Sequence, residues 1–172
     1  MTTNPRRDRN LEDGMIMEPS ERSIVVHRAP IWRDRADYIF RAAIPDPAPT
    51  ASIEQLWGRK QGHLIEVCCI PYFLYDVNLG DLVSLSDENT LESVVEDKGH
   101  CTFRAFFSEH LESIADVDRD LRGRGAGTEW LSNRLVALDA PSGEAASELS
   151  AFLATLENRG VLEYETGRLR SP

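Results

Sequence analysis

Residues 142–165 read SGEAASELSAFLATLENRGVLEYE and settle the architecture of the C-terminal half. Ser142 is a favoured helix N-cap, because its hydroxyl can accept a hydrogen bond from the first turn. Apolar residues then recur at helical spacing and form one stripe centred on Phe152: Ala145, Leu149, Phe152, Leu153 and Leu156. Gly160 is a favoured helix end, and the β-type run Val161–Glu165 follows it. The stretch therefore predicts a long helix followed by a strand.

The preceding residues continue this alternation of helices and strands. Two strands are expected at residues 129–131 and 135–138, joined by a short turn. A helix capped by Ser108 and ended by Gly123 is expected before them, and residues 100–107 form a strand before that helix. From Cys101 onward the predicted order is strand, helix, strand, strand, helix, strand, which is the ferredoxin-like βαββαβ plan.

The N-terminal half carries short β-type runs separated by turn residues. These runs are 23–27, 37–44, 53–58, 63–67, 82–85 and 91–95. A hairpin is expected around Gly58–Gly62, and the regular spacing predicts a curled sheet or small barrel. The predicted fold class is α+β: a small antiparallel β-unit over 23–99, then a ferredoxin-like half over 100–168, with one continuous domain over 23–168 as the alternative. Residues 1–22 are expected to form a disordered tail, because they hold few apolar residues.

The composition argues against several classes of protein. Of 172 residues, 19 are Lys or Arg and 29 are Asp or Glu, and the net charge of −10 argues against a nucleic-acid binder. The longest nearly apolar run, 67–75, is too short to span a membrane, and the N-terminus lacks the apolar core of a secretory signal. Three cysteines, with Cys68 and Cys69 adjacent, make a poor disulfide framework. We therefore expect a cytoplasmic protein with no nucleic-acid or membrane partner, and the oligomeric state stays open.

Residues 70–83, IPYFLYDVNLGDLV, resemble the central signature of the bacterial domain-of-unknown-function family DUF4265. Leu56-Trp57 and residues 99–104, 137–141 and 162–164 are similar to other recurring segments of that family, so the resemblance covers about residues 50–166. The sequence has Asp76 where the family pattern has Gly or a small residue, and Cys101 where Ser is usual. The resemblance implies a discrete bacterial domain and no particular mechanism.

One candidate ligand site lies on the predicted strand 100–107. Because side chains alternate between the faces of a strand, His100, Thr102 and Arg104 share one face and are spaced about 7 Å apart. An imidazole, a hydroxyl and a guanidinium in a row can hold a carboxylate or phosphate. Asp81, after Gly80, is a further candidate, although a turn aspartate that bonds its own backbone is the simpler interpretation. The alternative for the row is a solvated sheet face that forms cross-strand ion pairs.

Those cross-strand partners are expected to be Glu92 or Glu96. A metal site is not expected, because the His and Cys residues lack metal-ligand spacing and adjacent cysteines on a strand point apart. No cofactor is expected either. The aromatic residues are expected to join the two halves as a core: Tyr72, Phe73, Tyr75, Phe103, Phe106 and Phe107.

The negative charge is concentrated between Asp87 and Asp120, where ten acidic residues accompany three basic ones. An acidic face of this kind can dock a basic protein partner and steer its approach, and ordinary solvated surface is the alternative. The candidate partner-binding residues are Glu109, Glu112, Asp116 and Asp120. The sequence thus favours a non-catalytic protein-binding module, such as an adaptor or an immunity-like protein. The alternative is a small-ligand, anion-binding or enzymatic domain around His100, Thr102 and Arg104.

Overall fold

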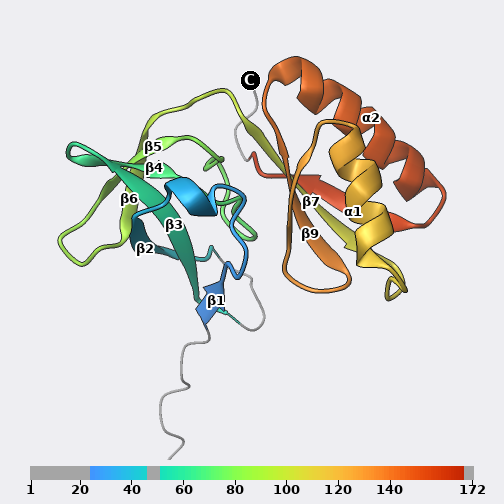
Figure 1. Cartoon of the computed structure of the whole chain (residues 1–172), viewed down its shortest axis with the longest axis horizontal. Helices are drawn as coiled ribbons and strands as arrows, with labels where there is room; N and C mark the ends of the chain where they lie inside the picture. Colours follow the sequence, from blue (N-terminus) through green and yellow to red (C-terminus); the bar gives the residue numbers. More distant parts are fainter. Residues whose placement is uncertain (1–23, 46–50, 169–172) are drawn as a thin grey trace, which may run out of the picture.

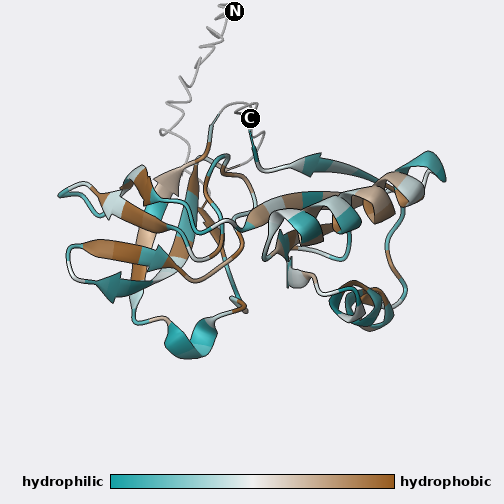
Figure 2. Cartoon of the chain, turned by 90° about the horizontal axis from the view of Figure 1, so that it is seen from above, coloured by the Kyte–Doolittle hydropathy of each residue, from teal (hydrophilic) through white to brown (hydrophobic). Residues whose placement is uncertain are grey.

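The computed structural model describes residues 24–45 and 51–168, and they form two β-sheets that lie side by side (Figure 1). Both helices belong to the second half of the chain. Seen from above, the two halves lie next to each other, and apolar residues occur in strands of both (Figure 2). We call the interface between the two halves the seam. The tail expected over residues 1–22 lies outside the described residues. Neither helix in the described part of the chain is long and apolar enough to cross a membrane.

The first sheet contains six strands. They are β1 (Ile24–Val26), β2 (Tyr38–Ala43), β3 (Ile53–Gln61), β4 (Leu64–Val67), β5 (Leu82–Leu85) and β6 (Leu91–Glu96). The order is β1-β3-β4-β5-β6, with β2 also paired to β3. The β1–β3 pair is parallel, whereas the sequence analysis expected an antiparallel unit throughout. The difference arises because the chain crosses from β1 through the short 3₁₀ helix η1 (Arg33–Arg35) and returns as β2 on the other edge of β3.

The first sheet curls but does not close. Arg41 of β2 approaches Thr90 in an isolated bridge, and the backbone N–H of Arg41 donates to the carbonyl of Asn89 at 3.1 Å. Among the described residues this is the one bridge between the two ends of the sheet, so a curled sheet rather than a closed barrel is present. Consequently β6 is an edge strand over most of its length.

The first hairpin turns later than expected. Strand β3 continues through Gly58 to Gln61, and the turn falls at Gly62, which has φ +65°. A Cβ atom at Gly58 would lie 2.3 Å from the side chain of Ile65 and 3.0 Å from the ring of Phe40. Gly58 is therefore needed for close packing inside the strand and not for the turn.

The second sheet contains β7 (Cys101–Phe107), β8 (Gly127–Trp130), β9 (Leu135–Ala140) and β10 (Leu162–Thr166), in the order β10-β7-β9-β8. All three of its pairings are antiparallel. Helices α1 (Ile114–Gly123) and α2 (Gly143–Asn158) connect the strands and cover the sheet (Figure 1). The predicted α+β class and ferredoxin-like order are confirmed.

Two details of the helices differ from the expectation. Helix α1 is capped by Ser113, whose hydroxyl accepts from the N–H of Asp116, whereas Ser108 donates to the carbonyl of Gly160. Helix α2 is capped by Ser142 as expected. The centre of its apolar stripe, however, is Leu153, which is fully buried, while Phe152 is partly buried.

The seam is filled by the irregular segment between β4 and β5, residues 68–81. Ile70, Tyr72 and Leu79 of this segment form an apolar cluster with Ala137 of β9. The face of the second sheet that the sequence analysis left to solvent or ligand therefore lies against the first half. Of the aromatic residues expected to join the halves, Tyr72 and Phe73 do lie in this cluster, whereas Phe103 and Phe107 belong to the core under the helices.

Candidate functional site

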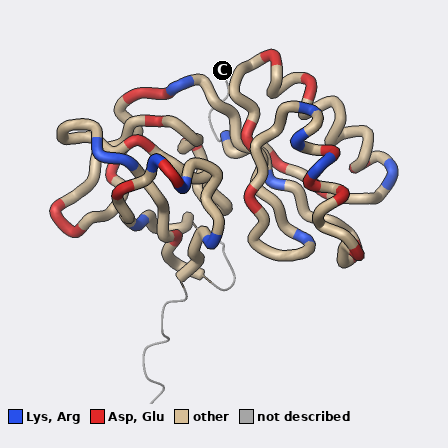
Figure 3. Tube along the Cα trace, in the orientation of Figure 1, with Lys and Arg blue, Asp and Glu red and all other residues tan. Residues whose placement is uncertain are grey.

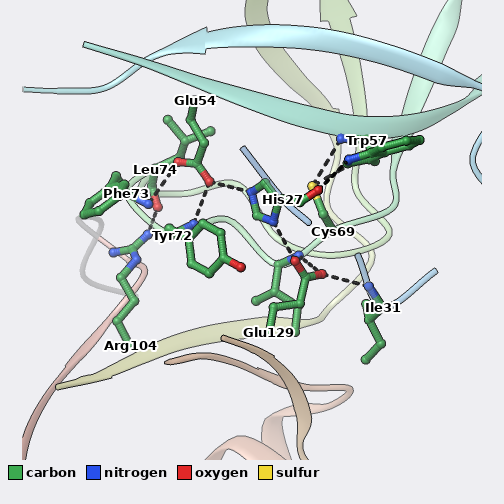
Figure 4. Close-up of polar contacts among 11 residues, drawn as sticks. His27, Ile31, Glu54, Trp57, Cys69, Tyr72, Phe73, Leu74, Arg104 and Glu129 are labelled. Atoms are coloured by element: carbon green, nitrogen blue, oxygen red, sulfur yellow. Dashed lines mark hydrogen bonds and ion pairs between the residues drawn. The ribbon is translucent and has the colours of Figure 1, made fainter. Parts of the chain in front are cut away.

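A buried histidine between two carboxylates ties the two sheets together at the seam (Figure 4). His27 follows β1, Glu54 lies in β3 and Glu129 in β8. The His27 Nδ1 atom is 2.5 Å from Glu129 Oε2, and Nε2 is 2.9 Å from Glu54 Oε1. All three residues are at most 2% exposed. We call these three residues the seam triad.

Backbone amides complete the coordination of both carboxylates. Glu129 Oε1 accepts from the N–H groups of Ile31 at 2.9 Å and Ile70 at 2.8 Å. Glu54 accepts hydrogen bonds of 2.6 and 3.0 Å from the amides at positions 72 and 73. These four donors belong to the 68–81 segment and to the loop after β1, so the two carboxylates fix the backbone that fills the seam.

Both ring nitrogens of His27 face a carboxylate oxygen, and this arrangement favours the imidazolium form. Only the protonated ring can donate from both nitrogens to acceptors. Burial by itself lowers the pKa of His27, but the contacts with the Cys69 sulfur, Glu129 and Glu54 outweigh burial and raise the pKa well above its usual value. The ring also stacks on Tyr72, with centroids 4.3 Å apart. Since the triad is enclosed, it serves to lock the two halves together and offers no surface to a substrate.

Arg104, one of the predicted ligand residues, is engaged within the chain. Its Nη1 atom donates to Glu165 Oε1 at 2.9 Å, and Nη2 donates to the carbonyl of Leu74. The guanidinium also lies over the ring of Tyr75, 4.7 Å from its centroid. The side chain is 5% exposed. The carboxylate that faces Arg104 is therefore that of Glu165 in β10, and not that of a bound ligand.

His100 and Thr102 also have partners in the seam. His100 Nδ1 lies 2.9 Å from both oxygens of the Asp139 carboxylate, and this hydrogen bond raises the pKa of His100. The N–H of Thr102 donates to Asn78 Oδ1 at 3.0 Å, and its buried hydroxyl has no partner among the described residues. The expected ion pairs with β6 are wrong, because β7 pairs with β9 and β10 while β6 belongs to the other sheet.

Asp81 has the role of a turn aspartate in the structure. Its Oδ2 accepts from the N–H of Asn78 at 2.8 Å, and Oδ1 accepts from the N–H of Lys98 at 2.9 Å. It is fully buried, and this burial raises its pKa. Asp81, His100, Thr102 and Arg104 thus all lie at or near the seam. Arg104 lines a hollow of about 310 Å³ to which His100 does not contribute.

The acidic residues do not gather on one face (Figure 3). On α1, Asp116 pairs with Arg119 at 2.8 Å. Asp118 and Asp120 likewise pair with the arginines four residues on, so the charges of this helix are balanced. Glu109 and Glu112 are exposed and precede α1, whereas Glu112 was expected on the helix. The remaining acidic residues of the segment lie on β6 and its flanking turns, in the other half.

An open groove of about 670 Å³ lies beside the edge strand β6. One wall is β6, with Val94 and the exposed Glu92, and the other wall is the 75–78 segment. Asp97 and Arg168 also line it. Among the described residues, β6 has β5 as its only strand partner, apart from the bridge at Thr90. Most of the outward backbone groups of this strand therefore have no strand partner among the described residues.

Neither the seam triad nor the groove was predicted from the sequence. The position of Glu54 could have been predicted, because Glu54 and Leu56 are two residues apart on a strand. Their side chains therefore point to the same face, which is the face toward the core. No comparable signal exists for the groove, because the edge position of β6 depends on the strand order. In the described residues, no group of three or more His, Cys, Asp or Glu side chains is placed to hold a metal ion.

Comparison with known proteins places this arrangement in a family. A solved structure, a hypothetical protein from Neisseria gonorrhoeae, shares the fold with a TM-score of 0.65 at 15% identity. The match covers 79% of this chain and 99% of the other. No curated protein matches. The model of the domain of unknown function DUF4265 matches residues 54–164, which run from within β3 into β10 and therefore cover most of the seam, and the chain belongs to the DUF4265 family.

Proposed function

We propose that this domain is a non-catalytic protein-binding module that accepts an extended, basic segment of a partner protein as an additional strand on β6. The observation that supports this function is the free edge of β6 at the wall of an open acidic groove. Strand addition satisfies the outward backbone groups of an edge strand, and pockets beside the strand select the side chains.

The charge of the groove favours a basic occupant. Three of its lining residues are acidic, and Arg168 is its single basic lining residue among those described. Glu92 is exposed at the edge, and the whole chain carries a net charge of −10. Like charges also disfavour the pairing of two β6 edges, so a second copy of this chain is a poor occupant. A basic segment is attracted at long range and then held by backbone hydrogen bonds.

The small-ligand alternative has weaker support. His100 and Arg104 already face the carboxylates of Asp139 and Glu165, and an incoming anion must displace them. The partner-binding role expected for α1 has the same weakness, since its aspartates are paired with arginines of the same segment. In the groove, Glu92 is exposed, and a basic chain can approach its carboxylate from solvent.

The test uses a fluorescein-labelled peptide of alternating lysine and threonine, with an alternating glutamate and threonine peptide as its control. We expect the lysine peptide alone to shift the backbone amide signals of β6 in NMR spectra. Alternate N-methylation of that peptide should abolish the shifts, because it removes the donors that strand addition needs. The proposal fails if the lysine peptide leaves the β6 signals unchanged, or if the N-methylated form binds equally well.

A pair of charge reversals separates the groove from the general charge of the protein. Glu92→Lys should weaken binding of the lysine peptide by about fivefold at low salt, and the effect should shrink as salt rises. Glu148→Lys makes the same change in net charge on the exposed side of α2 and should leave binding almost unchanged. Equal weakening by both variants, measured by fluorescence polarisation, would contradict a specific groove.

A further inference from the structure

A second hollow is linked to the groove through the contacts of Tyr75. The Tyr75 hydroxyl donates to Glu165 Oε2 at 3.0 Å, and the Arg104 guanidinium lies over its ring. Tyr75 lines the groove, whereas Glu165 and Arg104 line the second hollow of about 310 Å³. The two hollows are therefore neighbours, separated by the contact of these three side chains.

The walls of the second hollow are aromatic with acidic residues among them. The residues that line it include Tyr72, Phe73, Phe106, Glu163, Tyr164 and Glu165, although the ring of Tyr164 packs on the other face of β10 near Phe103. Leu135 and Arg104 complete it. Because Arg104 is already paired with Glu165, the exposed carboxylate of Glu163 leaves the lining with a net negative charge.

Phe106 is the unusual member of this lining. It is 44% exposed, whereas Phe103 and Phe107 on the same strand are 3% exposed. The guanidinium of Arg134 lies over its ring, 4.2 Å from the centroid. The ring therefore already has a cation–π partner within this chain, and a guest cation must either use the other face of the ring or displace Arg134.

We infer that this hollow is an anchor pocket for a cationic side chain, an arginine or lysine with an apolar stem. Aromatic faces attract a guanidinium or ammonium group, and the carboxylate of Glu163 can pair with it. The apolar stem replaces water against the rings. That the guest belongs to a bound partner protein rests on the proposed function, because the pocket adjoins the groove. The preference of the pocket for a cation is independent of that function.

The pocket can be tested without a peptide. We expect N-butylguanidinium to shift the NMR signals of Phe106, Glu163 and Tyr164 with a dissociation constant of about 1–10 mM. N-butylurea has nearly the same shape without the charge and should not shift them at the same concentrations. If the two probes bind equally, or if neither binds, the pocket does not select a cation and the inference is wrong.

Matched variants identify the groups that select the cation. Phe106→Leu should weaken N-butylguanidinium binding about three- to tenfold, because it keeps the bulk and removes the π-face. Phe152→Leu is the control, since Phe152 carries Arg124 over its ring at 3.7 Å but lies on α2, outside the pocket. Glu163→Gln should also weaken binding, and Glu148→Gln should not. An unchanged affinity in both pocket variants would overturn the inference.

The two proposals fail separately. If the lysine peptide shifts the β6 signals while N-butylguanidinium does not bind the pocket, strand addition at the groove is supported and the anchor pocket is wrong. If N-butylguanidinium binds the pocket in preference to N-butylurea while no peptide shifts the β6 signals, the anchor pocket is supported and strand addition is wrong.

Discussion

The protonated form of His27 is favoured in the interior because two carboxylates face the ring and four backbone amides donate hydrogen bonds to those carboxylates. Each partner depends on the others: a buried imidazolium without Glu54 and Glu129 would lose its proton, and the carboxylates without their donors would be costly to bury. The seam triad therefore acts as one unit, and a change at any member is felt by all three.

The free energy of unfolding should fall as pH rises above about 6.5. The pKa of His27 is raised in the folded protein, so the folded state holds its proton longer than the unfolded state. The stabilisation is fully present below the unfolded pKa and is lost as pH rises through the folded pKa. Urea denaturation between pH 6 and 9 should show this decline, and His27→Gln should reduce it. His63→Gln, in an exposed turn, should retain the decline, and a flat profile in the native protein would contradict the assignment.

Removal of one carboxylate should be far more costly than removal of a surface one. Glu129→Ala leaves Nδ1 of His27 and the amides of Ile31 and Ile70 without their acceptor. We expect a loss of about 3–5 kcal/mol in the free energy of unfolding at pH 7, measured by denaturant titration. Glu148→Ala, on the exposed side of α2, should change it by less than about 0.5 kcal/mol. A loss for Glu129→Ala as small as that of the control would mean that the seam triad contributes little.

At the scale of elements, periodicity was informative where one face of an element is buried. Helix α2 follows its apolar stripe, and the strands β7 to β10 are runs of β-type residues between turns, so the order of elements and the ferredoxin-like plan were predictable. The start of α1 was not, because both Ser108 and Ser113 are suitable caps and the choice depends on the contact of Ser108 with Gly160. The role of β7 was missed for a related reason: residues on both of its faces are buried, and a single sequence does not show what covers the second face.

The core of α2 should be more sensitive at Leu153 than at Phe152. Leu153 is fully buried under the second sheet, and Leu153→Ala should cost about 2–5 kcal/mol, because it leaves a cavity. Phe152 is partly buried and covered by Arg124, so Phe152→Ala should cost less. Thermal or urea denaturation of the two variants measures the difference. A larger loss of stability for Phe152→Ala than for Leu153→Ala would contradict this prediction. It would mean that Phe152 is the centre of the apolar stripe, as the sequence suggested.

At the scale of the whole molecule, the seam makes the two halves depend on each other. The 68–81 segment belongs by sequence to the first sheet, yet Ile70 and Tyr72 lie against Ala137 of the second. The hydrogen bonds of Arg104 to Leu74 and of Thr102 to Asn78 cross the same boundary. Of the two predicted divisions of the chain, we propose the single continuous domain over 23–168, because of these contacts across residue 100.

We therefore expect the native protein to unfold in one cooperative transition. Each half alone would expose the apolar cluster of the seam and leave buried charges unpaired, so a state with one half folded is unfavourable. Calorimetry should give a calorimetric enthalpy equal to the van't Hoff enthalpy, and tryptophan fluorescence and far-UV circular dichroism should report the same midpoint. Glu129→Ala removes the contacts between His27 and β8, and it should broaden the transition or split it in two. Two separate transitions in the native protein, with the midpoint of the second unaffected by Glu129→Ala, would instead establish two independent domains that merely touch.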